Sequence, residues 1–457
     1  MSFLAELANK KVVVLGGGVT GRAVVKFLID QKCHVSLIDD VESLVHGVSS
    51  AATLPKDEKF DLAIVSPGWR LNHPEVLALR SAQVEILSEL DLAWLVKSEI
   101  APEQKWVALT GTNGKTTAVK MVESIFKAAD VAGVACGNVG NPVIEVLTSG
   151  KLYDVLALEL SSFQIEWSRL PEYEAIAILN IAQDHIDWHG SFDSYANAKL
   201  RLLDHTRTAI LNFDDVEVAS RSFAHSVRKI YFSLNTPAPG ELGLVEELLV
   251  DRAFNADPSQ AEFVAELVDI KPTVPHNVSN ALAAIGLALS LKISYQAIQT
   301  GLQNFKTDHH RQELIAVIDD VSWVNDSKAT NPHAAAASLL SFFSVIWVAG
   351  GLAKGATMDS LVQRASSRIK AAILIGQDRQ LIADALQKYA PQVEIIFVDS
   401  SHGPEDLMRQ VVAAGKSLAE SGDTVLLAPA CASMDQFTNY AQRGDLFAAM
   451  VREHMPS

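Results

Sequence analysis

Short apolar runs alternate with amphipathic stretches along most of the chain. A run of four to eight apolar residues bounded by Gly, Asn or Asp predicts a buried strand, and apolar residues three or four apart predict a helix packed on one face. The alternation of the two predicts an α/β protein whose sheets are mostly parallel. We expect strands at residues 11–15, 34–38, 62–65, 106–109, 154–160, 175–180, 322–325, 345–349, 371–375, 394–398 and 424–428.

The pattern falls into three blocks, because the periodicity weakens at two places. Residues 102–105 are polar, and a new series of strands begins after residues 307–313. A chain of 457 residues is also too long for a single hydrophobic core. We therefore expect an N-terminal Rossmann-like domain at 1–101, a central P-loop-type ATPase domain at 102–308 and a C-terminal Rossmann-like domain at 309–457, with hinges near 98–105 and 305–310.

The central block opens with Leu109-Thr-Gly-Thr-Asn-Gly-Lys-Thr-Thr117. Strand, glycine-rich turn, lysine, hydroxyl and helix follow in the order that surrounds an anion with backbone N–H groups. Lys115 would reach the outer phosphates, and Thr116 would be free to bind Mg²⁺. Leu109 stands where the common P-loop has a glycine, so the motif is a variant. We interpret it as a nucleoside triphosphate site; a glycine-rich turn with a surface lysine is the alternative.

A second glycine motif, Gly16-Gly-Gly-Val-Thr-Gly21, follows the first strand and opens a helix. Asp39 ends the next strand about 20 residues further on, which is the layout of a dinucleotide-binding unit. By itself the motif suggests NAD with Asp39 on a ribose. The same loop can hold the pyrophosphate of a sugar nucleotide, and the glycines could also serve only close packing of helix on strand. All three interpretations stay open at this point.

Two further residues stand where predicted strands of the central block end. Glu159 closes the strand at 154–160, and His185 lies between two acids after the strand at 175–180. Ligands collect at the carboxyl edge of open α/β sheets, so Glu159 could bind Mg²⁺ beside a triphosphate. A glutamate paired with a neighbour and a structural histidine are the alternatives.

Lys199 lies on the apolar side of a predicted helix. The helix is expected to begin after Ser191, with one stripe formed by Phe192, Tyr195, Lys199 and Leu202. A desolvated lysine has a lowered pKa and becomes a nucleophile, which could add CO₂ to give a metal-binding carbamate. The alternative is a lysine whose stem packs while its ammonium reaches an acid, and the residues alone favour that alternative.

Asn277 and Asn280 stand near the start of a long Ala/Leu helix. They either cap that helix or contact an adenine edge.

Composition narrows the class of protein. The net charge of −16 argues against a nucleic-acid coat or a polybasic membrane anchor. Cys33, Cys136 and Cys431 stand far apart without metal spacing, which indicates a reducing compartment. No run of about 18 apolar residues and no secretory leader is visible. We expect a cytoplasmic protein, a monomer without nucleic-acid or membrane partners.

Taken together, the motifs resemble the Mur ligases of bacterial cell-wall synthesis over nearly the whole chain. The segments that carry the resemblance are Gly16–Gly21, Gly111–Thr117, Gly137–Gly140, Glu159–Gln164, Asp184-His185, Ala198–Leu200, His276-Asn277, His310-Arg311, Asn325–Asn331 and Ala430–Ser433.

The resemblance implies an ATP-dependent amide ligase, and it is strongest to members that add D-glutamate to UDP-N-acetylmuramoyl-L-alanine. ATP would phosphorylate the carboxylate of that substrate, the amine of D-glutamate would attack the acyl phosphate, and phosphate would leave. The implied cofactors are ATP, Mg²⁺ at two sites and a CO₂-derived carbamate on Lys199, which reverses the preference given above. Another Mur ligase or a folylpolyglutamate-synthase-like ligase is the alternative within this class.

The resemblance also assigns residues, position by position. Charge on the transferring phosphoryl group would be stabilised by Lys115 and Arg311. The implied metal-site residues are Thr116, Glu159, His185 and Lys199. The implied ATP-binding residues are Gly111, Thr112, Asn113, Gly114, Lys115, Thr116, Thr117, Asn277, Asn280, Arg311, Asp326 and Lys328. The UDP-substrate would contact Gly18, Val19, Thr20, Asp39, Ser66, Asn138 and His185, without NAD, and D-glutamate would contact Thr330, Lys354, Ser433 and Tyr440.

The chain departs from the family pattern at a few positions. Asp308-His309 stands before His310-Arg311 where Leu-Pro is usual, and Gln312, Pro275 and Tyr440 also differ.

Two other classes of protein compete with a ligase. An NAD-dependent oxidoreductase would explain the N-terminal glycine motif but not the second phosphate loop. A P-loop switch or transport ATPase would hydrolyse ATP without an amino-acid acceptor.

Overall fold

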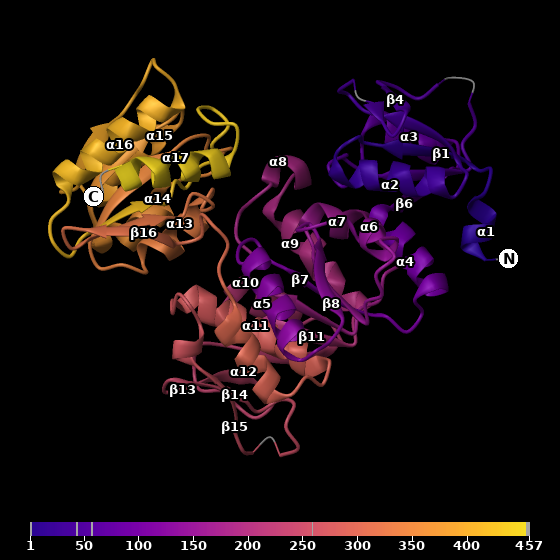
Figure 1. The fold of residues 1–457 in the computed structure, drawn as a ribbon, viewed down its shortest axis with the longest axis horizontal. Coiled ribbons are helices and arrows are strands. Elements are labelled where there is room, and N and C mark those ends of the chain that lie inside the picture. The colour runs from indigo at the N-terminus through magenta and orange to yellow at the C-terminus, as the bar shows by residue number, and fades with distance from the viewer. Residues whose placement is uncertain (1, 43, 56–57, 258, 454–457) are drawn as a thin grey trace. The chain divides into compact units, whose positions relative to one another are not determined.

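The protein is an α/β protein with three separate sheets, seen here in a computed structural model (Figure 1). The structure describes residues 2–42, 44–55, 58–257 and 259–453. These residues form two compact units, the first made of 1–181, 185–273 and 277–305, and the second of 182–184, 274–276 and 306–457. The first two sheets belong to the first unit and the third sheet to the second. Within the described ranges, no helix is both long and apolar enough to cross a bilayer.

The first sheet has the strand order β3-β4-β2-β1-β5-β6. Its central strand β1 is buried beyond its first residue and pairs in parallel with β2 and β5. The glycine motif leads from β1 into α2, as its spacing predicts. The β3–β4 hairpin was not expected. The elements are α1 (Phe3–Leu7), β1 (Lys11–Leu15), α2 (Val19–Asp30), β2 (His34–Ile38), β3 (Leu44–Val45), β4 (Val48–Ala51), β5 (Leu62–Val65), α3 (Pro74–Ser81), β6 (Glu85–Ser88) and α4 (Glu89–Ile100).

The second sheet has the order β15-β14-β13-β12-β11-β10-β7-β9-β8. Strands β7 to β12 are parallel, and β13 to β15 form an antiparallel extension at one edge. The elements before this extension are β7 (Lys105–Thr110), α5 (Lys115–Ala128), β8 (Gly133–Gly137), α6 (Val143–Leu147), β9 (Val155–Glu159), α7 (Ser162–Trp167), β10 (Ala175–Ile178), α8 (Ile186–His189), α9 (Phe192–Leu200), β11 (Thr208–Asn212), α10 (Val216–Ser222) and β12 (Arg228–Phe232).

Two helices complete this part of the chain after the antiparallel extension. Helix α12 packs on α5, the helix that follows the phosphate loop. Helix α11 is apolar on most of its surface, and its buried alanines and leucines cover the face of the sheet opposite α9 in the core around β7 and β10. The remaining elements are β13 (Leu242–Val245), β14 (Leu248–Asp251), β15 (Glu262–Glu266), α11 (Pro275–Ser290) and α12 (Tyr295–Asn304).

The third sheet has the order β16-β17-β21-β18-β19-β20, with β16 antiparallel to its neighbour and the other strands parallel. Strand β18 is buried along its whole length, as a strand covered by helices on both faces must be. The elements are β16 (Glu313–Ile318), β17 (Val321–Asn325), α13 (Pro332–Leu339), β18 (Val345–Gly350), α14 (Asp359–Ala365), β19 (Ile369–Ile375), α15 (Arg379–Tyr389), β20 (Glu394–Phe397), α16 (Pro404–Leu418), β21 (Thr424–Leu427) and α17 (Tyr440–Glu453).

Candidate active site

The phosphate loop connects β7 to α5 at the carboxyl edge of the second sheet. Gly114 has a φ of 84°, and a Cβ at this position would lie 2.4 Å from Asn280 Oδ1. Lys115 is the first residue of α5, and its ammonium donates to the carbonyls of Gly111 and Thr112 at 2.8 and 2.9 Å. The lysine therefore folds back over its own loop, where its charge would meet a bound phosphate.

Asn180, at the end of β10, also shapes this loop, although sequence reasoning did not select it. Its side-chain oxygen accepts a hydrogen bond from Asn113 N at 2.8 Å, and its amide donates to Asn113 O at 3.1 Å. Its own carbonyl accepts from Thr112 N at 2.9 Å. A polar residue at the end of an apolar strand, next to a phosphate loop, was the signal that could have found it.

Glu159 is buried where β9 ends, with 2% of its surface exposed. Its Oε1 accepts from Asn138 Nδ2 at 2.8 Å, whereas its Oε2 is buried without a hydrogen-bond partner among the described residues. An orphaned buried carboxylate oxygen fits a cation ligand, because otherwise its desolvation is uncompensated. Among those residues no group of three or more His, Cys, Asp or Glu side chains gathers around a point. Hydroxyl, carbamate, water or phosphate oxygens would have to complete such a site.

Lys199 carries its ammonium into the base of the phosphate loop. The side chain is 1% exposed, and Nζ donates to Gly111 O at 2.9 Å and to Thr110 Oγ1 at 3.3 Å. It also lies 4.7 Å from the centroid of the Tyr195 ring, whose hydroxyl is 2.9 Å from the Thr112 hydroxyl. Helix α9 begins after Ser191, whose hydroxyl caps it as predicted. Thr110 also donates to Leu160 O at 2.9 Å, so Lys199 lies beside the end of β9 that carries Glu159.

His185 lies in a left-handed conformation, with a φ of 52°, at the start of α8. Its ring packs edge-on against Phe163, with ring centroids 4.7 Å apart, and Phe163 also contacts Trp188 and His189. Burial, together with the nearby Lys199 and His185, lowers the pKa of His189 to about 4. His189 is therefore neutral at physiological pH, and its Nε2 lies 2.9 Å from the Ser162 hydroxyl.

The two residues assigned to adenine recognition lie at the start of α11. Asn277 and Asn280 are each 5% exposed. The Asn277 amide donates to Pro272 O at 3.1 Å, so part of its hydrogen-bonding capacity is used locally. Asn280 instead points its oxygen at Gly114, which places it against the phosphate loop rather than in a helix cap.

The N-terminal glycine loop is held by its own domain. A Cβ on Gly21 would lie 1.7 Å from Gly16 O, so close packing requires glycine here. Asp39 accepts a hydrogen bond from Gly17 N and a second from Val41 N. Val19, in contrast, is 72% exposed. The loop thus presents its first helical residue outward while Asp39 fixes its backbone.

In the second unit, the assigned residues follow β17, β18 and β21. Burial raises the pKa of Asp326 to about 6, even though Arg311 and the backbone N–H of Gln312 favour its carboxylate. The Lys328 ammonium lies 3.8 Å from the centroid of the Tyr440 ring. Ser433 is buried, Thr330 is half-buried, and Lys354 is exposed with a φ of 50°.

Arg443, on α17, joins two of these segments and was missed by sequence reasoning. Its guanidinium is fully buried and donates to Ser327 Oγ and Ser327 O at 3.0 and 2.9 Å, and to Cys431 O at 3.3 Å. Burial lowers its pKa to about 10, so it stays charged. Arg443 therefore ties the 325–331 segment to the 430–433 segment.

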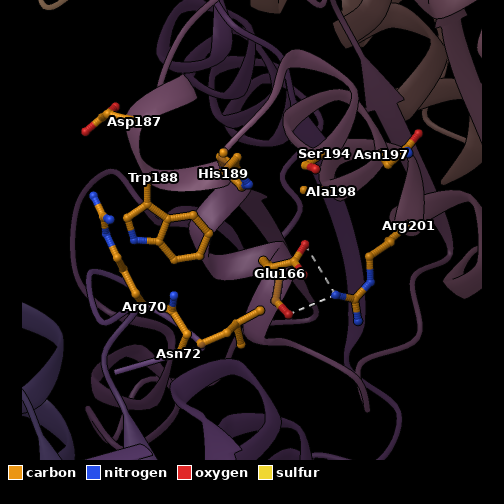
Figure 2. A pocket seen from close by; sticks show the side chains of 12 residues that line it. Arg70, Asn72, Glu166, Asp187, Trp188, His189, Ser194, Asn197, Ala198 and Arg201 are labelled. Carbon is orange, nitrogen blue, oxygen red and sulfur yellow. Dashed lines mark hydrogen bonds and ion pairs between the residues drawn. The ribbon is translucent and has the colours of Figure 1, made fainter. Parts of the chain in front are cut away.

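A polar cavity of about 580 Å³ lies between residues 70–72, which follow β5, and helices α7 to α9 (Figure 2). Arg70, Trp188 and Arg201 line it, and Arg201 pairs with Glu166 at 3.6 Å. Figure 2 shows Trp188 between Arg70 and His189. The cavity borders the segment that carries His185.

Models of three Mur ligase domains match successive parts of this chain. Residues 10–88 match the MurD-like N-terminal domain of Mur ligases, 109–288 the Mur ligase middle domain and 310–431 the Mur ligase glutamate ligase domain. A pseudomurein peptide ligase type C from Methanothermus fervidus has the same fold, with a TM-score of 0.62 at 19% identity over 98% of this chain and 100% of that one. MurF from Acinetobacter baumannii gives a TM-score of 0.60 at 19% identity, over 99% and 93%.

The chain belongs to the Mur ligase family. Within the family, it is similar along its full length to UDP-N-acetylmuramoylalanine–D-glutamate ligases. The enzyme so named from Thermobifida fusca is 44% identical, over 98% of this chain and 99% of its own, and that from Streptomyces coelicolor is 42% identical over the same shares.

Proposed function

We propose that the protein adds D-glutamate to UDP-N-acetylmuramoyl-L-alanine, with ATP, in the synthesis of peptidoglycan precursors. The observation that carries this proposal is the 44% identity to a D-glutamate ligase over 98% of the chain. That similarity includes all three sheets, and therefore the segments assigned to ATP, to the UDP-substrate and to the amino acid. The domain boundaries 1–101, 102–308 and 309–457 are part of the proposal, as are a monomeric state and a cytoplasmic location.

The phosphate loop would position ATP for transfer to the substrate carboxylate. The Lys115 ammonium, now on two carbonyls of its own loop, would exchange them for phosphate oxygens. Thr116, Glu159, His185 and carbamoylated Lys199 would hold Mg²⁺, and the orphaned Oε2 of Glu159 supports this assignment. When bound, Mg²⁺ neutralises charge on the phosphate oxygens. Arg311 would supply further positive charge to the transferring group.

The second step joins the amino acid to the activated carboxylate. The D-glutamate amine would form a C–N bond to the acyl carbon, the C–O bond to phosphate would break, and phosphate would leave with the electron pair while the amine loses a proton. Thr330, Lys354, Ser433 and Tyr440 would hold D-glutamate. Arg443 supports that site indirectly, because it holds the backbone of the two segments that carry Thr330 and Ser433.

The proposal also includes a carbamate on the side-chain nitrogen of Lys199. The Lys199 ammonium would first lose a proton, and the neutral amine would then add to CO₂, forming an N–C bond and releasing a second proton, which turns a buried cation into an anion. Its burial at 1% exposure and its position beside Glu159 favour this change. An ammonium beside Mg²⁺ would repel the metal, whereas a carbamate would bind it.

An acceptor panel tests the function directly. Purified protein is supplied with ATP, Mg²⁺, UDP-N-acetylmuramoyl-L-alanine and D-glutamate, L-alanine, L-lysine or meso-diaminopimelate, and phosphate release and amide product are measured. We expect both only with D-glutamate. Product with another amino acid would assign a different ligase, and phosphate release without any acceptor would indicate an ATPase. Binding of NADH in a spectroscopic titration would instead favour an oxidoreductase.

A further inference from the structure

The turn after β5 lies between the glycine loop of the first sheet and the helices around His185. Ser66 N donates to Leu15 O at 2.9 Å, and the Ser66 hydroxyl donates to Gly16 O at 3.3 Å. A Cβ on Gly16 would meet the Ser66 side chain at 2.8 Å and Trp69 Nε1 at 3.0 Å. The turn 66–69 is therefore packed directly against the loop assigned to the UDP-substrate.

Two indole N–H groups from the second sheet's helices hold this turn by its backbone. Trp167 Nε1, at the end of α7, donates to Trp69 O at 2.9 Å. Trp188 Nε1, in α8, donates to Gly68 O at 3.2 Å. Both bonds connect residues that lie about 100 or more positions apart in the chain, and their acceptors are consecutive carbonyls.

The same two helices begin next to the candidate metal residues, since α7 follows Glu159 and α8 follows His185. Trp188 is three residues after His185, and both rings pack on Phe163 with centroids 4.7 Å away. Phe163 and Trp167 share α7, which begins directly after the β9 end that carries Glu159. A continuous series of contacts thus runs from the glycine loop, through the turn and the two indoles, to His185 and Glu159.

We propose that Trp167 and Trp188 are positioning residues for the UDP-substrate: by holding carbonyls 68 and 69, they fix the glycine loop relative to the phosphoryl-transfer site. This inference rests on the proposed function. The substrate has its nucleotide at one end and its reacting carboxylate at the other, so productive binding needs a set distance between the two sites. A misplaced loop would bind the nucleotide but present the carboxylate poorly.

Trp188→Phe is the decisive variant, because phenylalanine keeps the ring contact with Phe163 and removes the N–H donor. Losing one neutral, partly exposed hydrogen bond should raise the KM for UDP-N-acetylmuramoyl-L-alanine about fivefold. The KM for ATP and for D-glutamate should stay within about twofold of wild type, because these substrates do not use the turn. Trp167→Phe should act in the same direction, and the double variant should raise this KM further, without simple multiplication, because both bonds hold one turn.

Trp106→Phe is the matched control. Trp106 Nε1 donates to Gln104 Oε1 at 2.9 Å at the start of β7, the end of the strand away from the phosphate loop. This variant also loses one indole hydrogen bond, here a buried one to a side chain, so its melting temperature should fall while all three KM values stay unchanged. A merely structural role for Trp188 would give the same result as this control.

The outcomes separate the two proposals. Wild-type protein that forms no amide with D-glutamate would overturn the proposed function. Active wild-type protein, with an unchanged KM for the UDP-substrate in Trp188→Phe, would overturn the positioning role alone. A loss spread equally over all three KM values would also overturn it. Calorimetric titration with UDP-N-acetylmuramoyl-L-alanine checks that the change in KM is a change in binding. If Trp167→Phe fails to fold, Trp188→Phe alone still tests the positioning role.

Discussion

Lys199 and Arg443 are two cations on the apolar sides of helices, and each is held by neutral oxygens near a proposed site. For Lys199, these are Gly111 O and Thr110 Oγ1 at the base of the phosphate loop. Lys199→Ala should lower ligase activity by about 100-fold or more, because the proposed carbamate would be lost from the metal site. Acetate should restore part of the activity by supplying a carboxylate, as measured by phosphate release.

Lys127→Ala is a suitable control for that prediction. Lys127 lies on α5 in the same domain, but it is mostly exposed and pairs with Glu123. Its removal should leave activity unchanged. Near-normal activity of Lys199→Ala would contradict a role in the reaction. Loss of activity without acetate rescue would speak against the carbamate specifically.

Asp326 should make stability depend on pH, because burial raises its pKa from 3.8 to about 6. Between these values the folded protein keeps a proton that the unfolded chain releases, so this stabilising contribution is complete below about pH 4 and lost as the pH rises through 6. Asp326→Asn removes the cost of the buried charge. We expect a free energy of unfolding about 1–2 kcal/mol above wild type at pH 7 and no gain at pH 4. Urea unfolding at both pH values measures it, and equal gains would contradict the assignment.

At the scale of single residues, the sequence could locate a side chain where a charged residue stands on an otherwise apolar stripe of a helix. Lys199 was found because it lies on a stripe with Tyr195, and the structure buries it as that stripe predicts. Arg443 carries the same signal, since Phe447 and Met450 follow it at helical spacing on α17. The partners of Arg443 could not have been predicted, because Ser327 and Cys431 lie about 100 residues apart in the sequence, in the loops after β17 and β21.

At the scale of elements, α4 begins with two buried carboxylates that bind the backbone of the second sheet's helices. Glu89 Oε1 accepts from Ile144 N at 2.7 Å, where α6 begins. Asp91 Oδ1 accepts from the backbone N–H groups of Arg169 and Leu170, each at 2.8 Å. Sequence patterning assigned α4 to the first domain and a hinge to 98–105. These contacts join the start of α4 to the second sheet's part of the chain, while α4 also packs against β5 and β6 of the first sheet, and the hinge near 98–105 stays a prediction.

Glu89 should also respond to pH. Burial raises its pKa from 4.5 to about 7, although backbone N–H groups at the start of α6 favour the charged form. Its stabilising contribution is present below about pH 4.5 and is lost as the pH rises through 7. Glu89→Gln keeps an acceptor for Ile144 N and removes the titration. We expect the wild type to lose about 2–3 kcal/mol over that range and the variant to lose correspondingly less. Identical pH profiles in urea unfolding would contradict this.

Sequence reasoning missed the short hairpins, and it also assigned no strand to β8, β11, β12 or β16. Residues 212–275 gave no clear prediction, yet they include β13, β14 and β15. The β13–β14 turn is formed by Glu246 and Glu247, with Glu246 in a left-handed conformation, rather than by the Gly or Asn that marks such turns. Strands of four residues with no turn signal cannot be told from loops by periodicity. The eleven strands that were predicted, in contrast, agree with the structure to within two residues at either end.

At the scale of the whole molecule, the residues assigned to catalysis and ATP binding are divided between the two units. Lys115, Glu159 and Lys199 belong to the first, whereas Arg311 and Asp326 belong to the second. One ATP molecule must meet both sets during phosphoryl transfer. The chain between α12 and β16 has no regular structure at residues 305–308, which allows the units to change position. We therefore expect substrates to favour a closed arrangement.

Small-angle scattering tests this expectation. A non-hydrolysable ATP analogue with Mg²⁺ and UDP-N-acetylmuramoyl-L-alanine should reduce the radius of gyration by about 1–2 Å, against roughly 22 Å for a compact chain of this length. Arg311→Ala should reduce the change, because it removes a cation that would join the second unit to the nucleotide bound by the first. Lys388→Ala, which removes an exposed cation of α15 from the same unit, should not. Scattering that is unchanged by ligands would mean that the two sets of residues do not come together on one ATP, and the assignment of Arg311 to phosphoryl transfer would fall with it.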